Sequence, residues 1–343
     1  FKDNDGGRSA TEPWLISSYG TGQRPKILIV GNGNGNDVIG SAADGVEYLA
    51  IIGLHFEQSN RTGDEGLEAI NLSCTVPGDA SDIIIEDNYI SGFSGGIIIG
   101  GPLSDVQIRR NSILNSWSSS SHSQGLYVSE TDGLLIEENF FDHNGWKPGT
   151  EVGTPSDEGG PTIYNHSMYL SHFVDNVTIR GNISSRASSL GLKFQPLEGT
   201  HYVTNNLFVQ NGSGIQLGGG QAAVQVGHSG ATIYANDNVV LEGTGNPGGG
   251  IGVGITNVKG GSFSNNIISN KINNTNQFAL SLRDGMGWES IGVGVRNFTI
   301  QNNTIYNWRG IVEVRQPTQT CEGGPLPVMQ NIDFINNTNQ EPD

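Results

Sequence analysis

Cysteine is scarce in this chain, which excludes one common way of stabilising a fold. Only Cys74 and Cys321 occur in 343 residues, and they lie in opposite halves of the sequence. Small secreted domains that lack a sufficient core are held together by several closely spaced disulfides. We therefore expect no disulfide framework and no bridge between these two residues.

Positive charge is also scarce. Seventeen Lys and Arg residues stand against 34 Asp and Glu residues, which gives a formal net charge of −17. Nucleic-acid binding depends on basic side chains that neutralise phosphates, so this balance excludes a general nucleic-acid-binding surface. It fits a soluble protein with an acidic surface. A polyanionic substrate would require the basic groups to be concentrated in one place.

Long apolar runs are missing as well. No stretch approaches the ~20 apolar residues that a membrane span needs, so we expect no membrane partner. The chain opens on the polar sequence Phe1-Lys2-Asp3 without a visible signal peptide, a start that suits a trimmed secreted protein and a cytosolic one equally. It ends shortly after Asn337, within a repeat, so we expect truncated termini.

Glycine, in contrast, is abundant. The chain has 51 glycines but only 13 prolines, and 15% of its residues are charged. Apolar residues recur in short blocks throughout, which is typical neither of collagen nor of a disordered chain. Elongated all-β folds often reach this length as one domain, and no stretch has a helical period. We therefore expect a single all-β domain over residues 1–343.

Short strands that end in asparagine recur along the chain. Residues 83–88 read Ile-Ile-Ile-Glu-Asp-Asn, and residues 106–111 read Val-Gln-Ile-Arg-Arg-Asn. Alternating apolar residues indicate strands, and the variable spacing suits a solenoid whose loops differ in length. We predict that the asparagines cap a sharp turn and stack into a ladder of side-chain amides. Its members are Asn88, Asn111, Asn139, Asn182, Asn206, Asn238, Asn266, Asn303 and Asn337.

A second set of strands follows, usually after a glycine, with apolar residues on either side of a variable one. Strand alternation predicts that the variable residue points outward. The predicted outward column is Asn71, Ile98, Tyr127, Tyr169, Lys193, Gln216, Gly252, Ser281 and Glu313. Two residues further on, a second column comprises Ser73, Gly100, Ser129, Ser171, Gln195, Gly218, Gly254, Arg283 and Arg315.

These asparagine-ended and glycine-led strands, with the opening segment Trp-Leu-Ile-Ser-Ser-Tyr-Gly-Thr-Gly at 14–22, resemble the right-handed parallel β-helix of the pectate-lyase-like superfamily. The resemblance implies a single-stranded parallel β-helix of about ten coils and a carbohydrate-active enzyme of the alginate or pectate lyase type. A long loop around 145–161 would be an insertion beside a groove. The same scaffold supports lyases, hydrolases, epimerases and phage tailspikes, so it does not fix the activity.

Tyr127, Tyr169 and Lys193 are predicted to occupy adjacent rungs, which lie about 4.8 Å apart. Cleavage of a uronic-acid polymer by β-elimination needs a cation for the carboxylate, a base for the adjacent proton and an acid for the leaving oxygen. We expect Lys193, helped by Arg186, to neutralise the carboxylate and Tyr169 or His166 to exchange the proton. The predicted substrate-binding residues are Tyr127, His122, His172, Gln195, Gln216, Arg283 and Trp146.

Plainer interpretations compete with each of these roles. A tyrosine on a sheet commonly packs against its cross-strand neighbours, a lysine on a solenoid face is most often solvated, and histidines can cap turns. Hydrolysis needs two carboxylates ~5 to 9.5 Å apart, and the predicted columns contain no central pair. The carboxylates Glu130, Asp132, Asp142 and Asp175 are available at turns. A glycoside hydrolase, a C5-epimerase and a glycan-binding solenoid without activity therefore stay open.

The expected partner is an extracellular polysaccharide, bound by a monomer that is secreted or periplasmic. No cofactor is required by this chemistry. Calcium needs several oxygen ligands, and Glu151, Asp157 and Glu158 on the long loop are available for it. No spacing of His or Cys indicates zinc.

Overall fold

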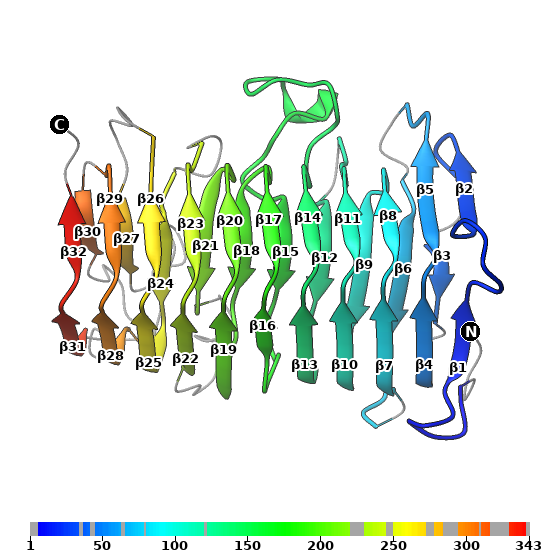
Figure 1. Cartoon of the computed structure of the whole chain (residues 1–343), viewed down its shortest axis with the longest axis horizontal. Coiled ribbons are helices and arrows are strands. Elements are labelled where there is room, and N and C mark those ends of the chain that lie inside the picture. Colours follow the sequence, from blue (N-terminus) through cyan, green and yellow to red (C-terminus); the bar gives the residue numbers. More distant parts are fainter. Residues whose placement is uncertain are drawn as a thin grey trace, which may run out of the picture.

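The chain winds into a parallel β-helix in which each coil adds one strand to each of three sheets (Figure 1). The computed structural model describes residues 6–33, 37–41, 45–62, 66–78, 80–119, 122–219, 230–244, 250–271, 278–283, 294–308, 310–315 and 329–340. Two sheets have 11 strands and the third has 10, in agreement with about ten predicted coils. In this part of the chain, no helix is long and apolar enough to cross a membrane.

The strands of each sheet follow one another at every third place in the chain. The first sheet contains β1 (Trp14–Ser17), β4 (Glu47–Ile52), β7 (Ser81–Glu86), β10 (Leu103–Arg109), β13 (Thr131–Glu137), β16 (Thr178–Arg180), β19 (Thr200–Thr204), β22 (Ala231–Asn236), β25 (Val258–Ser264), β28 (Arg296–Gln301) and β31 (Gln330–Ile335). The second contains β2 (Lys26–Val30), β5 (His55–Ser59), β8 (Tyr89–Ser91), β11 (Ser112–Leu114), β14 (Phe140–Asp142), β17 (Ile183–Ser185), β20 (Leu207–Val209), β23 (Val239–Leu241), β26 (Ile267–Ser269), β29 (Thr304–Tyr306) and β32 (Thr338–Gln340).

The third sheet carries the glycine-led strands. It contains β3 (Asp37–Gly40), β6 (Glu68–Ser73), β9 (Gly95–Gly100), β12 (Gln124–Val128), β15 (His166–Leu170), β18 (Leu190–Phe194), β21 (Ser213–Leu217), β24 (Val253–Thr256), β27 (Phe278–Arg283) and β30 (Gly310–Arg315). The sequence predicts the strands of the first and third sheets. It does not identify the strands of the second sheet as distinct strands. Most of them have only three residues and directly follow the ladder asparagines.

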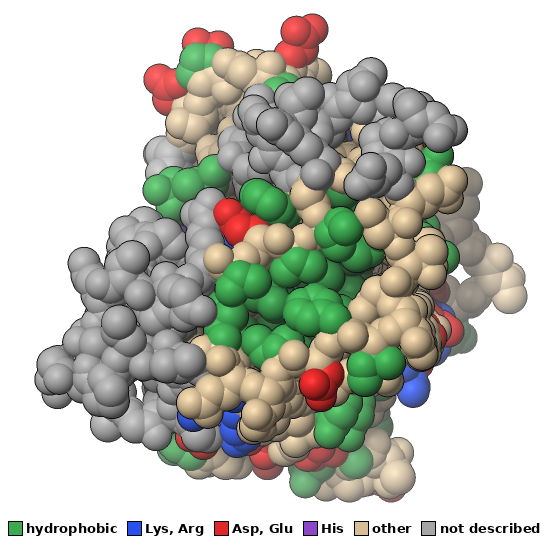
Figure 2. Space-filling view, turned by 90° about the vertical axis from the view of Figure 1, so that its left-hand side faces the viewer, with side chains coloured by type: hydrophobic (Ala, Val, Ile, Leu, Met, Phe, Trp, Pro, Cys, Tyr) green, Lys and Arg blue, Asp and Glu red, His purple; other side chains and the backbone are tan. Residues whose placement is uncertain are grey.

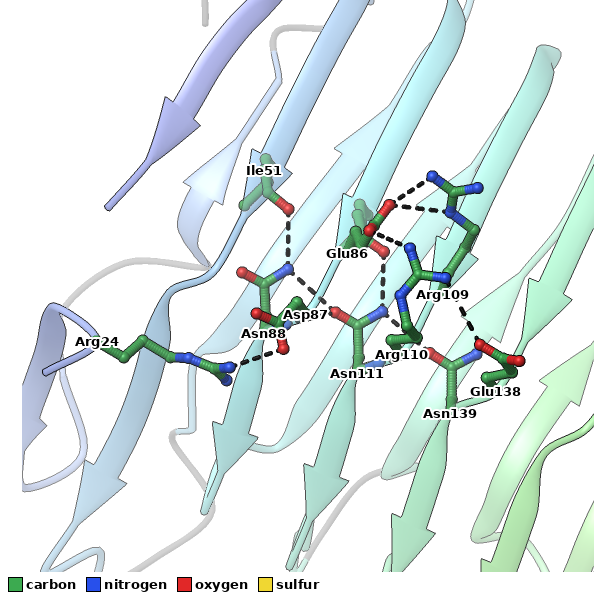
Figure 3. Close-up of polar contacts among 11 residues, drawn as sticks. Arg24, Ile51, Glu86, Asp87, Asn88, Arg109, Arg110, Asn111, Glu138 and Asn139 are labelled. Atoms are coloured by element: carbon green, nitrogen blue, oxygen red, sulfur yellow. Dashed lines mark hydrogen bonds and ion pairs between the residues drawn. The ribbon is translucent and has the colours of Figure 1, made fainter. Parts of the chain in front are cut away.

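The predicted asparagine ladder is confirmed along the corner between the first and second sheets. From Asn88 to Asn303, each Nδ2 donates to Oδ1 of the next member over 2.8–3.0 Å. Each amide also binds backbone: the Nδ2 of Asn88 donates to the Ile51 carbonyl (Figure 3). The Oδ1 of Asn111 accepts the Asn88 N–H. The buried polar groups of the turn are therefore satisfied by a repeated side chain.

The residue before a ladder asparagine usually adopts a left-handed backbone, as Asp87, Arg110 and Glu138 do with φ of 52°, 53° and 55°. This conformation makes the corner sharp and sends the preceding side chains outward. On that outer side, Arg109 and Arg110 both pair with Glu86 (Figure 3). Burial raises the pKa of Glu86, but the hydrogen bonds from the two arginines outweigh it and hold that pKa below its usual value.

The interior is a continuous stack of apolar side chains from all three sheets. Ile83, Ile108 and Ile136 of the first sheet are fully buried. Figure 2 views the end of the solenoid that carries β31, where hydrophobic side chains gather in the middle of the face. Cys74 is a buried free thiol, and Cys321 lies outside the described residues.

The long loop between β14 and β15 stands out from the side of the solenoid (Figure 1). It contains the 3-10 turn η1 (Ser156–Glu158) and follows the corner that joins the second sheet to the third. The Gly145 N–H donates to the Ser116 carbonyl and the Lys147 N–H to the Gly159 carbonyl. The first bond ties the base of the loop to the preceding coil, and the second closes the loop on itself.

Candidate functional site

The outward column of the third sheet is aligned as predicted over its central rungs. Tyr127 pairs with Tyr169, Tyr169 with Lys193, and Lys193 with Gln216. The residues on either side of each, such as Leu192 and Phe194, are fully buried. Strand alternation then turns the middle residue to the outer face.

One position of the predicted column is wrong. Gln216 pairs with Gly254, which in turn pairs with Ser281, so Gly254 occupies the place predicted for Gly252. A Cβ on Gly252 would lie 2.9 Å from Ile268 and 3.1 Å from Trp308, so this glycine faces the core. A run of alternating glycines allows either register, and the pairing with β21 and β27 selects one.

Lys193 lies against an aromatic and amide group formed by the neighbouring rungs. Its Nζ is 4.5 Å from the centroid of the Tyr169 ring, a cation–π distance. The Tyr169 ring meets that of Tyr127 edge to face at 5.4 Å. The Tyr169 hydroxyl donates to Oε1 of the buried Gln195 over 3.1 Å. Tyr127, Tyr169 and Lys193 are half-buried, so they form a partly exposed polar floor.

His166 lies beneath this floor and not on it. Its side chain is buried, its ring centroid is 5.5 Å from that of Tyr169, and its Nδ1 accepts the Leu190 N–H over 3.2 Å. Its Nε2 has no hydrogen-bond partner among the described residues. Burial, with the nearby charges of Lys193 and His122, holds the pKa of His166 well below its usual value. The ring is therefore neutral at neutral pH.

His172 is a second neutral histidine near Lys193, and it is only half-buried. Its Nδ1 lies 3.0 Å from the Ser171 hydroxyl. Burial lowers its pKa, and the Lys193 ammonium lowers it further. We refer to Tyr127, His166, Tyr169, His172, Lys193 and Gln195 as the Lys193 cluster. The exposed His122 lies beside it, with its ring centroid 5.4 Å from that of Tyr164.

Arg186 and Trp146 belong to a different group of side chains. Arg186 follows β17 at the corner leaving the second sheet, where its guanidinium pairs with Asp142. Burial raises the pKa of Asp142, but the Arg186 hydrogen bonds outweigh it and lower that pKa. Trp146 donates from Nε1 to the Arg186 carbonyl and stacks on His143 at 4.4 Å. The charge of Arg186 is thus matched by Asp142, and its assistance to Lys193 stays a prediction.

Two other predicted residues are engaged within the third sheet. Gln216 is buried and donates from Nε2 to the Gly218 carbonyl over 3.3 Å. Arg283 pairs with Glu313 at 3.0 Å and donates to the Ser281 hydroxyl over 2.6 Å. Both lie on the predicted sheet, but each is held by its own neighbours.

The carboxylates considered for hydrolysis or metal binding are spread over several corners. Asp132 and Asp175 form a parallel bridge on neighbouring rungs, whereas Asp142 lies with Arg186. Among the described residues, no three His, Cys, Asp or Glu side chains gather into a metal-binding group. Glu151, Asp157 and Glu158 are exposed on the loop.

Sequence reasoning missed two features. The sequence places Ser171 in the second column without a role, although its hydroxyl lies 3.0 Å from Nδ1 of His172; its position directly before the histidine is the available signal. A cavity of about 430 Å³ is lined by Arg61, Trp117 and Lys147, among others. These residues come from distant coils, and no sequence motif joins them.

Comparison with known proteins identifies the family. The model of the right-handed beta helix region matches residues 26–240. The A-module of a mannuronan C-5 epimerase from Azotobacter vinelandii has a similar structure, with a TM-score of 0.52, 14% identity and coverage of 95% of this chain and 86% of that one.

Two further solved structures are similar at lower scores. An alginate lyase from a Paenibacillus species gives a TM-score of 0.42 with 10% identity over 90% of this chain and 99% of that one. A surface adhesin of Streptococcus pneumoniae gives 0.45 with 12% identity over 87% and 83%. No curated protein matches the sequence. Identities this low do not indicate a shared activity. The family match, however, spans more than half of the sequence, and the chain therefore belongs to the right-handed beta helix family.

Proposed function

We propose that the protein is a polysaccharide lyase that cleaves a uronic-acid polymer at the Lys193 cluster. The observation that carries the proposal is the combination of the Lys193 ammonium, the Tyr169 ring 4.5 Å from it and the neutral His172 beside it. In a chain with a net charge of −17, such a partly exposed cation suits a carboxylate ligand. Alginate is the first polymer to test, since a module named for acting on mannuronan has this fold.

In the proposed reaction, Lys193 pairs with the carboxylate of the sugar and stabilises the charge that develops there. His172 takes the proton from the adjacent carbon, because its lowered pKa keeps it unprotonated. The electron pair forms a carbon–carbon double bond, and the bond to the glycosidic oxygen breaks. Tyr169 gives its proton to that oxygen, and Gln195 orients the phenol.

This assignment makes His172 the base, whereas the sequence analysis expects Tyr169 or His166 to exchange the proton. His166 is buried, so a sugar proton would not reach it, whereas the half-buried His172 offers a ring edge. His166 then acts as a positioning residue beneath Tyr169. Tyr127 and His122 contact the substrate. The protein acts as a monomer on an extracellular polysaccharide. It is a secreted or periplasmic enzyme and requires no cofactor.

The test uses Lys193→Ala and Lys193→Arg on polymannuronate and on polygalacturonate, with the rate of unsaturated, ultraviolet-absorbing product as the readout. Lys193→Ala should lower the rate at least ~10²-fold, and Lys193→Arg should retain more activity because it keeps the charge. Lys271→Ala is the matched control, since Lys271 pairs with Glu242 on another surface. An undiminished rate in Lys193→Ala would rule out this site.

A C5-epimerase is the second candidate, because the cluster holds two groups able to exchange a proton, Tyr169 and His172. An epimerase removes the same proton and returns one to the opposite face without breaking the chain. It predicts incorporation of solvent deuterium at that carbon with no new chain ends. A lyase predicts new ends in proportion to the absorbance.

A further inference from the structure

A cavity of about 430 Å³ lies on the opposite side of the long loop's corner from the Lys193 cluster, against the second sheet. Its walls come from β5, β8, the turn after β11 and the start of the loop. The volume falls in the range of roughly 300–1,000 Å³ that is usual for small-molecule sites. The Lys193 cluster, in contrast, lies on the third sheet.

Two cations meet one indole ring in this cavity. The guanidinium carbon of Arg61 is 4.3 Å from the Trp117 ring centroid, and Nζ of Lys147 is 5.1 Å from it. Trp117 and Arg61 are both buried, and Nη1 of Arg61 donates to the Gly92 carbonyl over 3.0 Å. The indole therefore holds both cations on a fixed support.

The loop positions Lys147 by its own backbone bonds. The Lys147 N–H donates to the Gly159 carbonyl over 2.8 Å, which closes the base of the loop. Gly159 has a φ of 86°, and a Cβ there would lie 2.7 Å from the Lys147 Cβ and 3.3 Å from the Trp117 ring. A side chain at this position would push Lys147 off the indole.

The rest of the lining includes several polar side chains but, among the described residues, no further cation. Asn60, Asn115 and Ser91 offer amide and hydroxyl groups, and Glu57 offers a carboxylate. The hydrogen bond from Lys26 holds the pKa of Glu57 below its usual value, so Glu57 is ionised at neutral pH. An ionised carboxylate accepts hydrogen bonds from sugar hydroxyls, whereas inorganic phosphate at neutral pH has few protons to donate to it.

We propose that this cavity is a second binding site, specific for a carboxylated sugar unit. The sugar carboxylate would bind Lys147 in the field of Arg61, and its hydroxyls would bind Glu57, Asn60 and Asn115. The site is independent of catalysis at Lys193, and it would hold an acidic saccharide on the second-sheet side of the solenoid.

The experiment uses the full chain with Lys193→Ala, so that no ligand is consumed, and titrates a trimannuronate while tryptophan emission and heat of binding are followed. Adding Lys147→Gln should weaken binding about tenfold or more, because a charge-assisted contact is lost. Adding Lys271→Gln should leave the affinity unchanged. Asn115→Asp, which keeps a residue tolerant of its left-handed backbone, should also weaken binding by adding negative charge.

Neutral trisaccharide and inorganic phosphate are the comparison ligands. The proposal predicts that neither competes with trimannuronate for the Lys147-dependent site. Equal affinities in the Lys147→Gln and control proteins would overturn it, and so would equal competition by phosphate or by the neutral sugar. If the wild-type protein shows no lyase activity but binds trimannuronate in a Lys147-dependent way, the proposed function fails and this second site stands.

Discussion

The asparagine ladder and the third-sheet strands around His166 differ in how far their buried polar groups are hydrogen-bonded. Along the ladder, amide donors and acceptors are matched rung after rung by the same residue type (Figure 3). On the third sheet, His166 Nε2, Ser167 Oγ and Gln216 Oε1 are buried without a partner among the described residues. Repetition therefore satisfies the polar groups of the ladder, whereas the polar groups under the third-sheet face differ from rung to rung and no repeated partner satisfies them.

The largest effect should come from breaking the ladder with Asn139→Ala. This change leaves the Ile108 carbonyl and the Asn111 N–H without their buried partner. We expect the free energy of unfolding to fall by about 3 kcal/mol or more, read from the denaturant midpoint. The exposed Asn339→Ala is the matched control and should change it little. Equal midpoints for the two variants would show that the ladder does not stabilise the scaffold.

Tyr169→Phe should lower activity at the third-sheet face without lowering the stability of the β-helix. It removes the hydroxyl that donates to Gln195 but keeps the ring under Lys193. We expect product formation to fall about 10²-fold with little change in the unfolding midpoint. Tyr202→Phe, an exposed tyrosine on the first sheet, serves as the control. Wild-type activity in Tyr169→Phe would remove this residue from the proton transfer.

The histidines whose pKa is lowered by burial predict that acidification weakens the fold. Burial lowers the folded-state pKa of His143, His166 and His201 below 6.5, so the unfolded chain takes up protons first as the pH falls. Stability is complete above the unfolded pKa of about 6.5 and decreases below it, by up to ~1.4 kcal/mol per pH unit for each group.

Melting temperatures measured between about pH 7.5 and 5.5 test this sign. His166→Asn keeps an acceptor for the Leu190 N–H but removes the titrating ring, so it should flatten the pH dependence. A variant with the same slope as the wild type would show that His166 is not the buried neutral group.

The smallest effect is expected for Arg186→Asn, a residue that tolerates the left-handed backbone at this position. The change removes the guanidinium that pairs with Asp142, although Ser185 still donates to that carboxylate. We expect a loss of about 1 kcal/mol in stability and little change in lyase rate, since Arg186 lies outside the Lys193 cluster. A large loss of activity in assays with saturating polymer would show that Arg186 takes part in the reaction at the Lys193 cluster.

The sequence supports the scaffold prediction because its signals are local and repeated. The ladder follows from asparagines at one place in each strand, and the Tyr127, Tyr169 and Lys193 column follows from strand alternation. The glycine run at 248–254 allows two frames, which is why Gly252 was chosen in place of Gly254.

Pairing around the site could not be obtained in this way, although part of the burial could. His166 lies two residues before the buried Met168, so alternation already places it on the core side, and only the fully buried Ser167 departs from alternation. The Arg186 pair depends on Asp142, which lies one coil earlier. The Trp117 cavity needs four segments that only the solenoid brings together.

The most direct test of the central claim is to count chain ends while the wild-type protein acts on polymannuronate. Lyase action at the Lys193 cluster predicts one unsaturated, ultraviolet-absorbing end for every new reducing end. Reducing ends without absorbance, or neither kind of end on any uronic-acid polymer, would contradict the claim.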